Sequence, residues 1–193
     1  MVIRPTGQRL LLGSNSPRRR ELMGMLADDF SVAVPHDVDE SYPADMPAVD
    51  VPVFLSSMKA YSYLDELKEN EILITADTVV IHGDRILGKP HDEEEARRML
   101  RLLSDSPHKV VTGVTLTDIR HRQSFATMTE VLFDRLDDSE IEAYIRECRP
   151  MDKAGAYGIQ EWIGAIGIKA INGCYYNVMG LPVHDLYHAL KTF

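Results

Sequence analysis

The chain has 193 residues, a length that fits a single domain, with room for two lobes around a cleft. Hydrophobic residues make up 45% and charged residues 26%, and 12 Gly with 10 Pro are too few for a disordered, fibrous or low-complexity chain. The formal charge of −9 disfavours broad contact with nucleic acid, so we expect no nucleic acid partner, although a few clustered cations can still bind a small polyanion.

No uncharged stretch approaches the roughly 18 apolar residues that would span a bilayer, and residues 1–12 lack a signal-peptide core. The two cysteines, Cys148 and Cys174, show neither metal-binding nor disulfide spacing. We therefore expect a cytoplasmic protein with no membrane partner.

The first elements are predicted to be strand, loop, helix and strand. Residues 9–13 form a short apolar run ending in glycine, typical of a buried strand. Ser16 is a candidate N-cap and Pro17 suits the first position of a helix running to about Ala27. A second strand is expected at residues 30–34. The predicted core stripe of the helix is Leu22, Met25 and Leu26.

Residues 36–50 are rich in Asp, Pro and Glu and predict a loop. A helix follows over about residues 53–68, and a β-branched run at residues 71–81 predicts a central strand that contains Asp77. The expected inner face of the helix is Val53, Ser57, Ala60, Leu64 and Leu67.

The middle of the chain predicts a hairpin and a capped helix. Gly83 and Asp84 form a turn signal before a short strand at residues 85–88. Asp92 and Glu95 resemble a capping box. The core stripe of the helix that follows is Ala96, Met99, Leu100 and Leu103.

Alternating residues at 109–119 and 123–133 predict a second hairpin. Asp137 with Glu140 predicts another capped helix, Asn172-Gly173 predicts a third hairpin, and Pro182 begins a closing helix to about Lys191. Together these elements predict a mixed α/β chain with one elongated sheet flanked by helices. The residues expected to face the core in the capped helix are Ile141, Tyr144 and Ile145.

The strand-to-helix turn at residues 13–19 carries hydroxyl and guanidinium groups that suit a phosphate. Helix N-termini offer unpaired N–H groups, to which Ser14, Ser16, Arg18 and Arg19 would add directed donors. An ordinary helix cap followed by a solvated basic turn fits the same residues.

Asp77 lies inside an apolar strand, where a carboxylate must be paired, bind a metal or titrate abnormally. Catalytic or ligand-binding use is favoured, and a structural ion pair with a lysine is the alternative. Lys59, Lys89 and Lys153 are candidate cations, although each taken singly is typical of a solvated surface lysine.

Residues 152–160 read DKAGAYGIQ. Two glycines three residues apart would let the backbone approach a ligand, and Gln160 offers the donor and acceptor that a base edge needs. A plain glycine-bearing loop fits equally well. His184 and His188 are four residues apart without an accompanying Glu, so we assign them no metal.

Eight motifs occur in one order along nearly the whole chain. They are residues 12–19 (LGSNSPRR), 39–40 (DE), 58–60 (MKA), 76–80 (ADTVV), 87–90 (LGKP), 112–114 (TGV), 152–160 (DKAGAYGIQ) and 180–182 (GLP). This set resembles the Maf (septum-formation-inhibitor-like) nucleotide pyrophosphatases, and DKAGAYGIQ resembles the branch acting on dTTP and UTP. Two departures are Gly13, where the family usually has Ala, and the absence of the arginine often found shortly before Lys59.

The resemblance implies a single Maf/ITPase-like domain over residues 1–193, with two lobes around a central cleft. It also implies a house-cleaning enzyme that hydrolyses dTTP and UTP to the monophosphate and pyrophosphate. Asp77 would be the general base and, with Glu40, would hold Mg²⁺ or Mn²⁺. The residues expected around the triphosphate are Ser14, Ser16, Arg18, Arg19, Lys59, Lys89 and Lys153, and those expected to distinguish the base are Arg18, Thr78 and Gln160.

We expect a small nucleotide substrate and a homodimer. Two alternatives remain at this stage. One is a pyrophosphatase of the same family that prefers CTP or 7-methyl-GTP, and the other is a nucleotide-binding regulator of septation without turnover.

Overall fold

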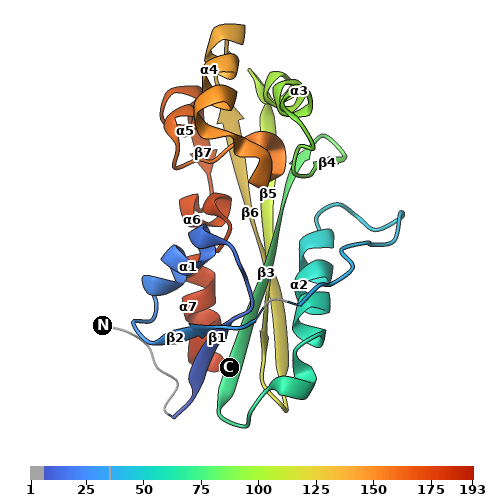
Figure 1. Cartoon of the computed structure of the whole chain (residues 1–193), viewed down its shortest axis with the longest axis vertical. Helices are drawn as coiled ribbons and strands as arrows, with labels where there is room; N and C mark the ends of the chain where they lie inside the picture. Colours follow the sequence, from blue (N-terminus) through green and yellow to red (C-terminus); the bar gives the residue numbers. More distant parts are fainter. Residues whose placement is uncertain (1–6, 35) are drawn as a thin grey trace. The chain divides into compact units, whose positions relative to one another are not determined.

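A computed structural model of the chain describes residues 7–34 and 36–193 (Figure 1). It contains a seven-stranded mixed sheet in the order β2-β1-β3-β5-β6-β7, with β4 paired to β3, and this confirms the predicted α/β class. The strands are β1 (Arg9–Leu12), β2 (Phe30–Val32), β3 (Glu71–His82), β4 (Arg85–Leu87), β5 (Pro107–Thr117), β6 (Arg122–Phe133) and β7 (Ile168–Asn172). The α-helices are α1 (Pro17–Gly24), α2 (Val51–Tyr61), α3 (Glu93–Leu103), α4 (Asp138–Cys148), α5 (Trp162–Gly167), α6 (Tyr175–Met179) and α7 (Val183–Thr192).

The chain divides into two compact units. Unit 1 comprises the described residues up to Asp77 together with Thr112–Thr127 and Gly180–Phe193. Unit 2 comprises Thr78–Val111 and Met128–Met179. The division falls within the long strands, so β3, β5 and β6 each contribute residues to both units.

In unit 1, β1 is the inner strand of a parallel group. It pairs with β2 on one side, Leu10 opposite Phe30, and with β3 on the other, Leu10 opposite Ile72. Leu10 and Leu12 are buried, as the apolar run predicts for a strand flanked on both edges. β1 and β3 therefore run in the same direction, and β1 ends at Leu12 opposite Ile74, three residues before Asp77.

Helix α1 begins where predicted, with Ser16 as N-cap, but it ends at Gly24 rather than near Ala27. The prediction that Met25 faces the core is wrong, because its side chain is 58% exposed while Met23 is buried. Met25 is the C-cap residue, so the helical spacing on which the predicted stripe was based has ended there.

Helix α2 is shorter than predicted and presents a different face. It ends at Tyr61, and a 3₁₀ turn at Leu64–Glu66 replaces its expected last turns. Of the predicted inner residues, Ala60 is buried and the Ser57 hydroxyl lies 3.2 Å from Thr115 Oγ1 of β5, whereas Val53 is only partly buried. The fully buried positions of the helix are Val51, Pro52, Leu55, Ser56 and Ala60. Contact with β5 at Gly113 and Thr115, and not the apolar pattern alone, determines which face of α2 is buried.

In unit 2, the two predicted caps are confirmed. Asp92 accepts the Glu95 N–H at the start of α3, and Asp137 with Glu140 forms a reciprocal capping box at the start of α4. The predicted core stripe of α3 is buried throughout, as are Ile141, Tyr144 and Ile145 of α4. The β3–β4 hairpin is also confirmed, with Val80 opposite Leu87.

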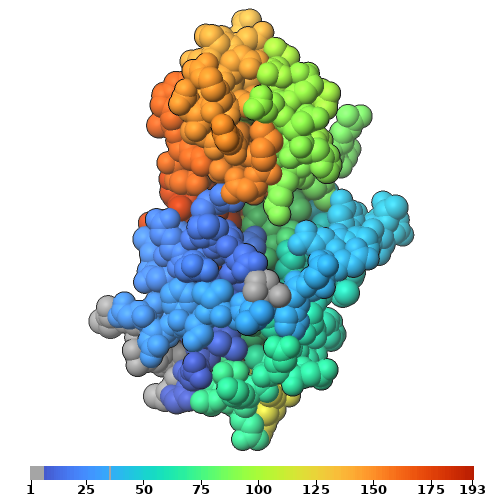
Figure 2. Space-filling model, viewed as in Figure 1, coloured from blue at the N-terminus to red at the C-terminus, as the bar shows by residue number. Residues whose placement is uncertain are grey.

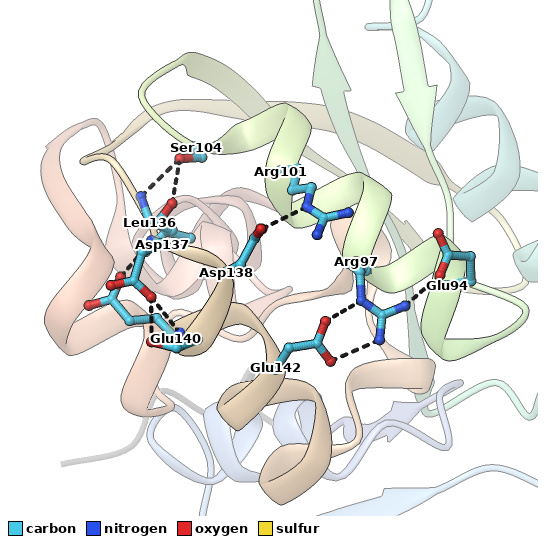
Figure 3. Close-up of polar contacts among 10 residues, drawn as sticks. Glu94, Arg97, Arg101, Ser104, Leu136, Asp137, Asp138, Glu140 and Glu142 are labelled. Carbon is cyan, nitrogen blue, oxygen red and sulfur yellow. Dashed lines mark hydrogen bonds and ion pairs between the residues drawn. The ribbon is translucent and has the colours of Figure 1, made fainter.

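Helices α3 and α4 are joined on their outer sides by ion pairs. The Arg97 guanidinium binds both carboxylate oxygens of Glu142, and Arg101 Nε lies 2.8 Å from Asp138 Oδ1 (Figure 3). The two helices, green and orange, lie against each other on the surface of this unit (Figure 2). Because bidentate arginine–carboxylate pairs are directional, the Arg97–Glu142 pair fixes how α4 is oriented against α3.

The predicted hairpin at Asn172-Gly173 is wrong. Strand β7 ends at Asn172, and helix α6 follows from Tyr175. Thr129 of β6 explains the difference, since its hydroxyl accepts the Cys174 N–H at 3.0 Å and a side-chain N–H of Asn177 at 3.0 Å. These tertiary bonds direct the chain into a helix where the two-residue signal predicts a returning strand. The closing helix predicted after Pro182 is confirmed as α7.

Candidate active site

The turn between β1 and α1 in unit 1 is organised by its own serines. The Ser14 hydroxyl accepts the Ser16 N–H at 3.3 Å, and the Ser16 hydroxyl accepts the Arg19 N–H at 3.4 Å as the N-cap of α1. Both predicted phosphate-binding serines therefore lie at the helix N-terminus, where they also hold the shape of the turn.

Arg19 connects this turn to the strand that carries Asp77. Its Nε donates to the Gly180 carbonyl and its Nη1 donates to the Ala76 carbonyl, each at 2.8 Å. Burial lowers the pKa of Arg19, and the neighbouring carboxylates of Asp77 and Glu40 oppose that shift. Since Ala76 immediately precedes Asp77, the guanidinium holds the backbone next to the candidate base.

Asp77, Lys59 and Glu40 form a direct three-residue cluster. Lys59 Nζ lies 2.6 Å from Asp77 Oδ1 and 2.7 Å from Glu40 Oε1. The Asp77 side chain is 13% exposed and that of Glu40 is 53% exposed. Glu40 comes from the loop at residues 36–50, which is the light-blue segment on the surface in Figure 2. The ion pair with a lysine, which was the alternative interpretation of Asp77, is therefore present. Its partners, Lys59 and Glu40, are themselves predicted site residues.

Close packing of α2 against β5 positions Lys59. A Cβ placed on Gly113 would lie 2.2 Å from the carbonyl carbon of Pro52, so only glycine allows this approach. The Ser56 hydroxyl lies 2.9 Å from Thr115 Oγ1, and the Thr75 hydroxyl donates to the Ser56 carbonyl at 2.7 Å. Sequence reasoning did not identify these hydroxyls, although Gly113 belongs to the TGV motif and pointed to this strand.

Glu40 and Asp77 fit a hard divalent cation in their chemistry. Both residues offer carboxylate oxygens, and one oxygen of each lies in contact with the Lys59 ammonium group. Magnesium is commonly bound by one or two carboxylates together with water and substrate phosphates. Over residues 7–34 and 36–193, no group of three or more His, Cys, Asp or Glu side chains is arranged to hold a metal. Glu40 and Asp77 therefore supply the carboxylates of a set that protein side chains alone do not complete.

In unit 2, the DKAGAYGIQ segment forms a folded loop on the end of β4. The Gly155 N–H donates to the Gly88 carbonyl at 3.0 Å, which places the loop beside exposed Lys89. Gly155 has a positive φ of 68°, and a Cβ there would lie 3.0 Å from the Val80 side chain. Thr78 begins this unit's part of β3 and is partly buried.

Lys153 and Gln160 lie in this loop but in different surroundings. Lys153 is buried, and its Nζ lies 2.8 Å from Asp152 Oδ1 and 3.0 Å from Glu161 Oε1. Gln160 is exposed and lines a hollow of about 460 Å³ together with Glu161, Lys169 and Tyr175. Sequence reasoning missed Glu161, which directly follows the motif and pairs with its lysine.

A family model described as a Maf-like protein matches residues 9–193, from the first strand to the last residue of the chain. The chain belongs to the Maf family. The family resemblance of the eight motifs is therefore confirmed.

Several relatives with about half of their residues identical to this chain share the same name. A protein of Bacteroides thetaiotaomicron named dTTP/UTP pyrophosphatase is 50% identical over 94% of both chains. Proteins of the same name from Phocaeicola vulgatus and Porphyromonas gingivalis are 48% and 49% identical, and cover 95% and 96% of this chain and 95% and 94% of their own. Within the described residues, none of the helices combines the length and the apolar character needed to cross a membrane.

The contact at Gly113 generates a testable prediction. Gly113→Ala should lower the free energy of unfolding by about 3 kcal/mol or more, because the new methyl group would overlap the Pro52 backbone. Any folded fraction should also lose pyrophosphate release, since α2 carries Lys59. Urea unfolding and a pyrophosphate assay would measure both effects.

Gly24→Ala is the matched control. It lies at the end of α1, where an added Cβ meets no atom within 4 Å, so stability should hold or rise slightly. Equal stability of the two variants would contradict the packing argument.

Proposed function

We propose that this chain hydrolyses dTTP and UTP to the monophosphate and pyrophosphate. The observation that carries the proposal is the Asp77–Lys59–Glu40 cluster, which brings together three residues that the family motifs place at the site. The shared name of relatives near 50% identity supports the nucleotide preference.

Asp77 serves in this proposal as the general base. Its carboxylate accepts a proton from the water that attacks the α-phosphorus, and pyrophosphate then leaves with the electrons of the broken bond. Lys59 fixes one Asp77 oxygen at 2.6 Å, and Arg19 holds the preceding carbonyl, so the base has little freedom to turn. A Mg²⁺ or Mn²⁺ ion held by Glu40 and Asp77 would supply charge for the phosphate oxygens.

The triphosphate requires positive charge and N–H donors. In unit 1, the N-terminus of α1 with Ser14, Ser16 and Arg18 supplies both, and Lys59 and Arg19 add charge beside Asp77. The family motifs assign Lys89 and Lys153 to the phosphates as well. Of these, Lys89 is exposed, whereas Lys153 is already bound to two carboxylates, so we expect Lys89 to contribute more.

The base preference is assigned to Gln160, Arg18 and Thr78 by the same motifs. Gln160 supports this role because its side-chain amide is exposed and offers both a donor and an acceptor. A house-cleaning role in the cytoplasm fits these substrates, and both cysteines are free thiols, as a reducing compartment requires.

We also propose a homodimer formed through β7. This strand stands last in the sheet order, and nearby apolar side chains are exposed. An edge strand flanked by apolar groups is a template for pairing with a second copy. The exposed side chains are Trp162, Ile166, Ile171 and Tyr175.

Sedimentation velocity should therefore show a dimer that Ile171→Lys weakens by tenfold or more, since burying a lysine charge without a partner at the interface is costly. Met128→Lys, an equally apolar exposed position on β6, is the control and should leave the dimer intact. A wild type that is monomeric at tens of micromolar would contradict the proposal.

Asp77→Asn should lower the turnover of UTP by about 10²–10⁴-fold, because the amide keeps the shape but cannot accept the proton. Nucleotide binding, measured by calorimetry, should be largely retained. Asp50→Asn is the control, since Asp50 is an exposed residue before α2 whose side chain makes no capping bond. A folded Asp77→Asn protein with wild-type rate would remove Asp77 from the mechanism.

The preference for the base gives a separate prediction. Uracil and thymine present acceptor, donor and acceptor along one edge, whereas cytosine reverses two of these groups and would leave buried polar groups unpaired at about 1–3 kcal/mol each. The wild type should therefore accept UTP and dTTP and reject CTP and 7-methyl-GTP in kcat/KM. Gln160→Ala should reduce this discrimination, and a wild type that prefers CTP or 7-methyl-GTP would overturn the assignment to this branch.

A further inference from the structure

Tyr144 of α4 is buried in unit 2 and makes one hydrogen bond to the DKAGAYGIQ loop and one to Glu161, which follows it. Its side chain is among the largest fully buried ones, at 1% exposure. The hydroxyl accepts the Gly158 N–H at 3.0 Å and donates to Glu161 Oε2. Burial, followed by the bond to Glu161, raises the pKa of Tyr144 well above its usual range, so the hydroxyl keeps its proton and remains a donor.

Glu161 extends this contact across the loop. Its other carboxylate oxygen, Oε1, lies 3.0 Å from Lys153 Nζ, at the opposite end of the segment. Its backbone N–H donates to the Gly158 carbonyl at 3.0 Å. A chain of polar contacts therefore runs from Gly158 through Tyr144 and Glu161 to Lys153, and it closes the loop on itself.

Gln160 lies against the same groups. A Cβ on Gly158 would lie 3.1 Å from Gln160 Nε2 and 2.9 Å from Glu161 Cδ. The Gln160 amide is thus packed over Gly158, whose backbone is held by the Tyr144 hydroxyl. Movement of Gly158 would move the surface on which the Gln160 side chain rests.

We propose that Tyr144 and Glu161 are positioning residues that set the geometry of Gln160 and thereby the choice of base; this inference rests on the proposed function. Tyr144 contacts the loop through the Gly158 N–H, and Glu161 contacts it through Lys153. Loss of the hydroxyl would leave the buried Gly158 N–H without this acceptor and one oxygen of the partly buried Glu161 without this donor. The loop then relaxes, and Gln160 no longer meets the base edge at a fixed distance.

Tyr144→Phe is the decisive variant, because it keeps the buried ring and removes one oxygen atom. The kcat/KM ratio of UTP over CTP should fall about tenfold, as expected when buried polar groups lose their partner. The kcat for UTP should change less than threefold or so, because the groups around Asp77 are untouched. Amide hydrogen exchange at Gly158 should become faster by tenfold or more.

Two comparisons separate positioning from general stability. Glu142→Gln, on the same helix, removes the carboxylate that binds Arg97 outside the loop, and it should leave the UTP/CTP ratio unchanged (Figure 3). The double variant Tyr144→Phe/Gln160→Ala should discriminate no worse than Gln160→Ala alone, since Tyr144 acts through Gln160.

A folded Tyr144→Phe protein with a wild-type ratio and wild-type Gly158 exchange would overturn the inference, and so would losses that multiply in the double variant. Should Tyr144→Phe fail to fold, Glu161→Gln tests the same network, because it removes the charge that pairs with Lys153, and an unchanged ratio there overturns it equally. A wild type that releases no pyrophosphate from UTP or dTTP would instead contradict the proposed function, and Gly158 exchange would still test the positioning.

Discussion

One ammonium group shared by two carboxylates organises the candidate site of unit 1. Lys59 is 18% exposed in its side chain and Asp77 only 13%, so neither charge is well solvated by water alone. A partly buried charge that loses its partner is costly, often by several kcal/mol. The strand with Asp77, the helix with Lys59 and the loop with Glu40 are therefore constrained together. The helix is held for this pairing by its close approach to β5, where residue 113 has no room for a side chain.

The two adjacent arginines of the α1 turn differ in a way that composition does not reveal. Arg19 uses its guanidinium on the carbonyls of Ala76 and Gly180, two segments far apart in the sequence. A fixed cation bound to backbone carbonyls ties the two segments together and still contributes positive potential beside Asp77. Arg18 is partly exposed, and its charge is close enough to lower the pKa of Arg19. Neighbouring residues on a helix point about 100° apart, so Arg18 and Arg19 are directed to different surroundings.

Local signals predicted local structure well. The caps at Asp92 and Asp137 form as expected because a cap needs only residues within one turn of each other. The hairpin predicted at Asn172-Gly173 does not form, because the hydroxyl of Thr129, more than forty residues earlier, binds the backbone N–H of Cys174. Asp77 and Lys59 are 18 residues apart and lie in a strand and a helix. Each could therefore be identified as a candidate from the sequence, but their contact could not be predicted. Only the resemblance to the family's ordered motifs placed Asp77 and Lys59 at one site.

The glycines of the motifs show how packing constraints imitate ligand-binding signals. The two glycines of the 152–160 loop predict a close approach of the backbone to a ligand, but in the structure each lies close to side-chain atoms of the protein. Gly155 lies against Val80 with a left-handed φ, and Gly158 lies against the side chains of Gln160 and Glu161. Gly13, which stands where the family usually has Ala, lies against the Thr75 methyl group, where a Cβ would come within 2.9 Å. These three glycines are required by packing against neighbouring protein atoms, and the chemistry of the site is carried by side chains.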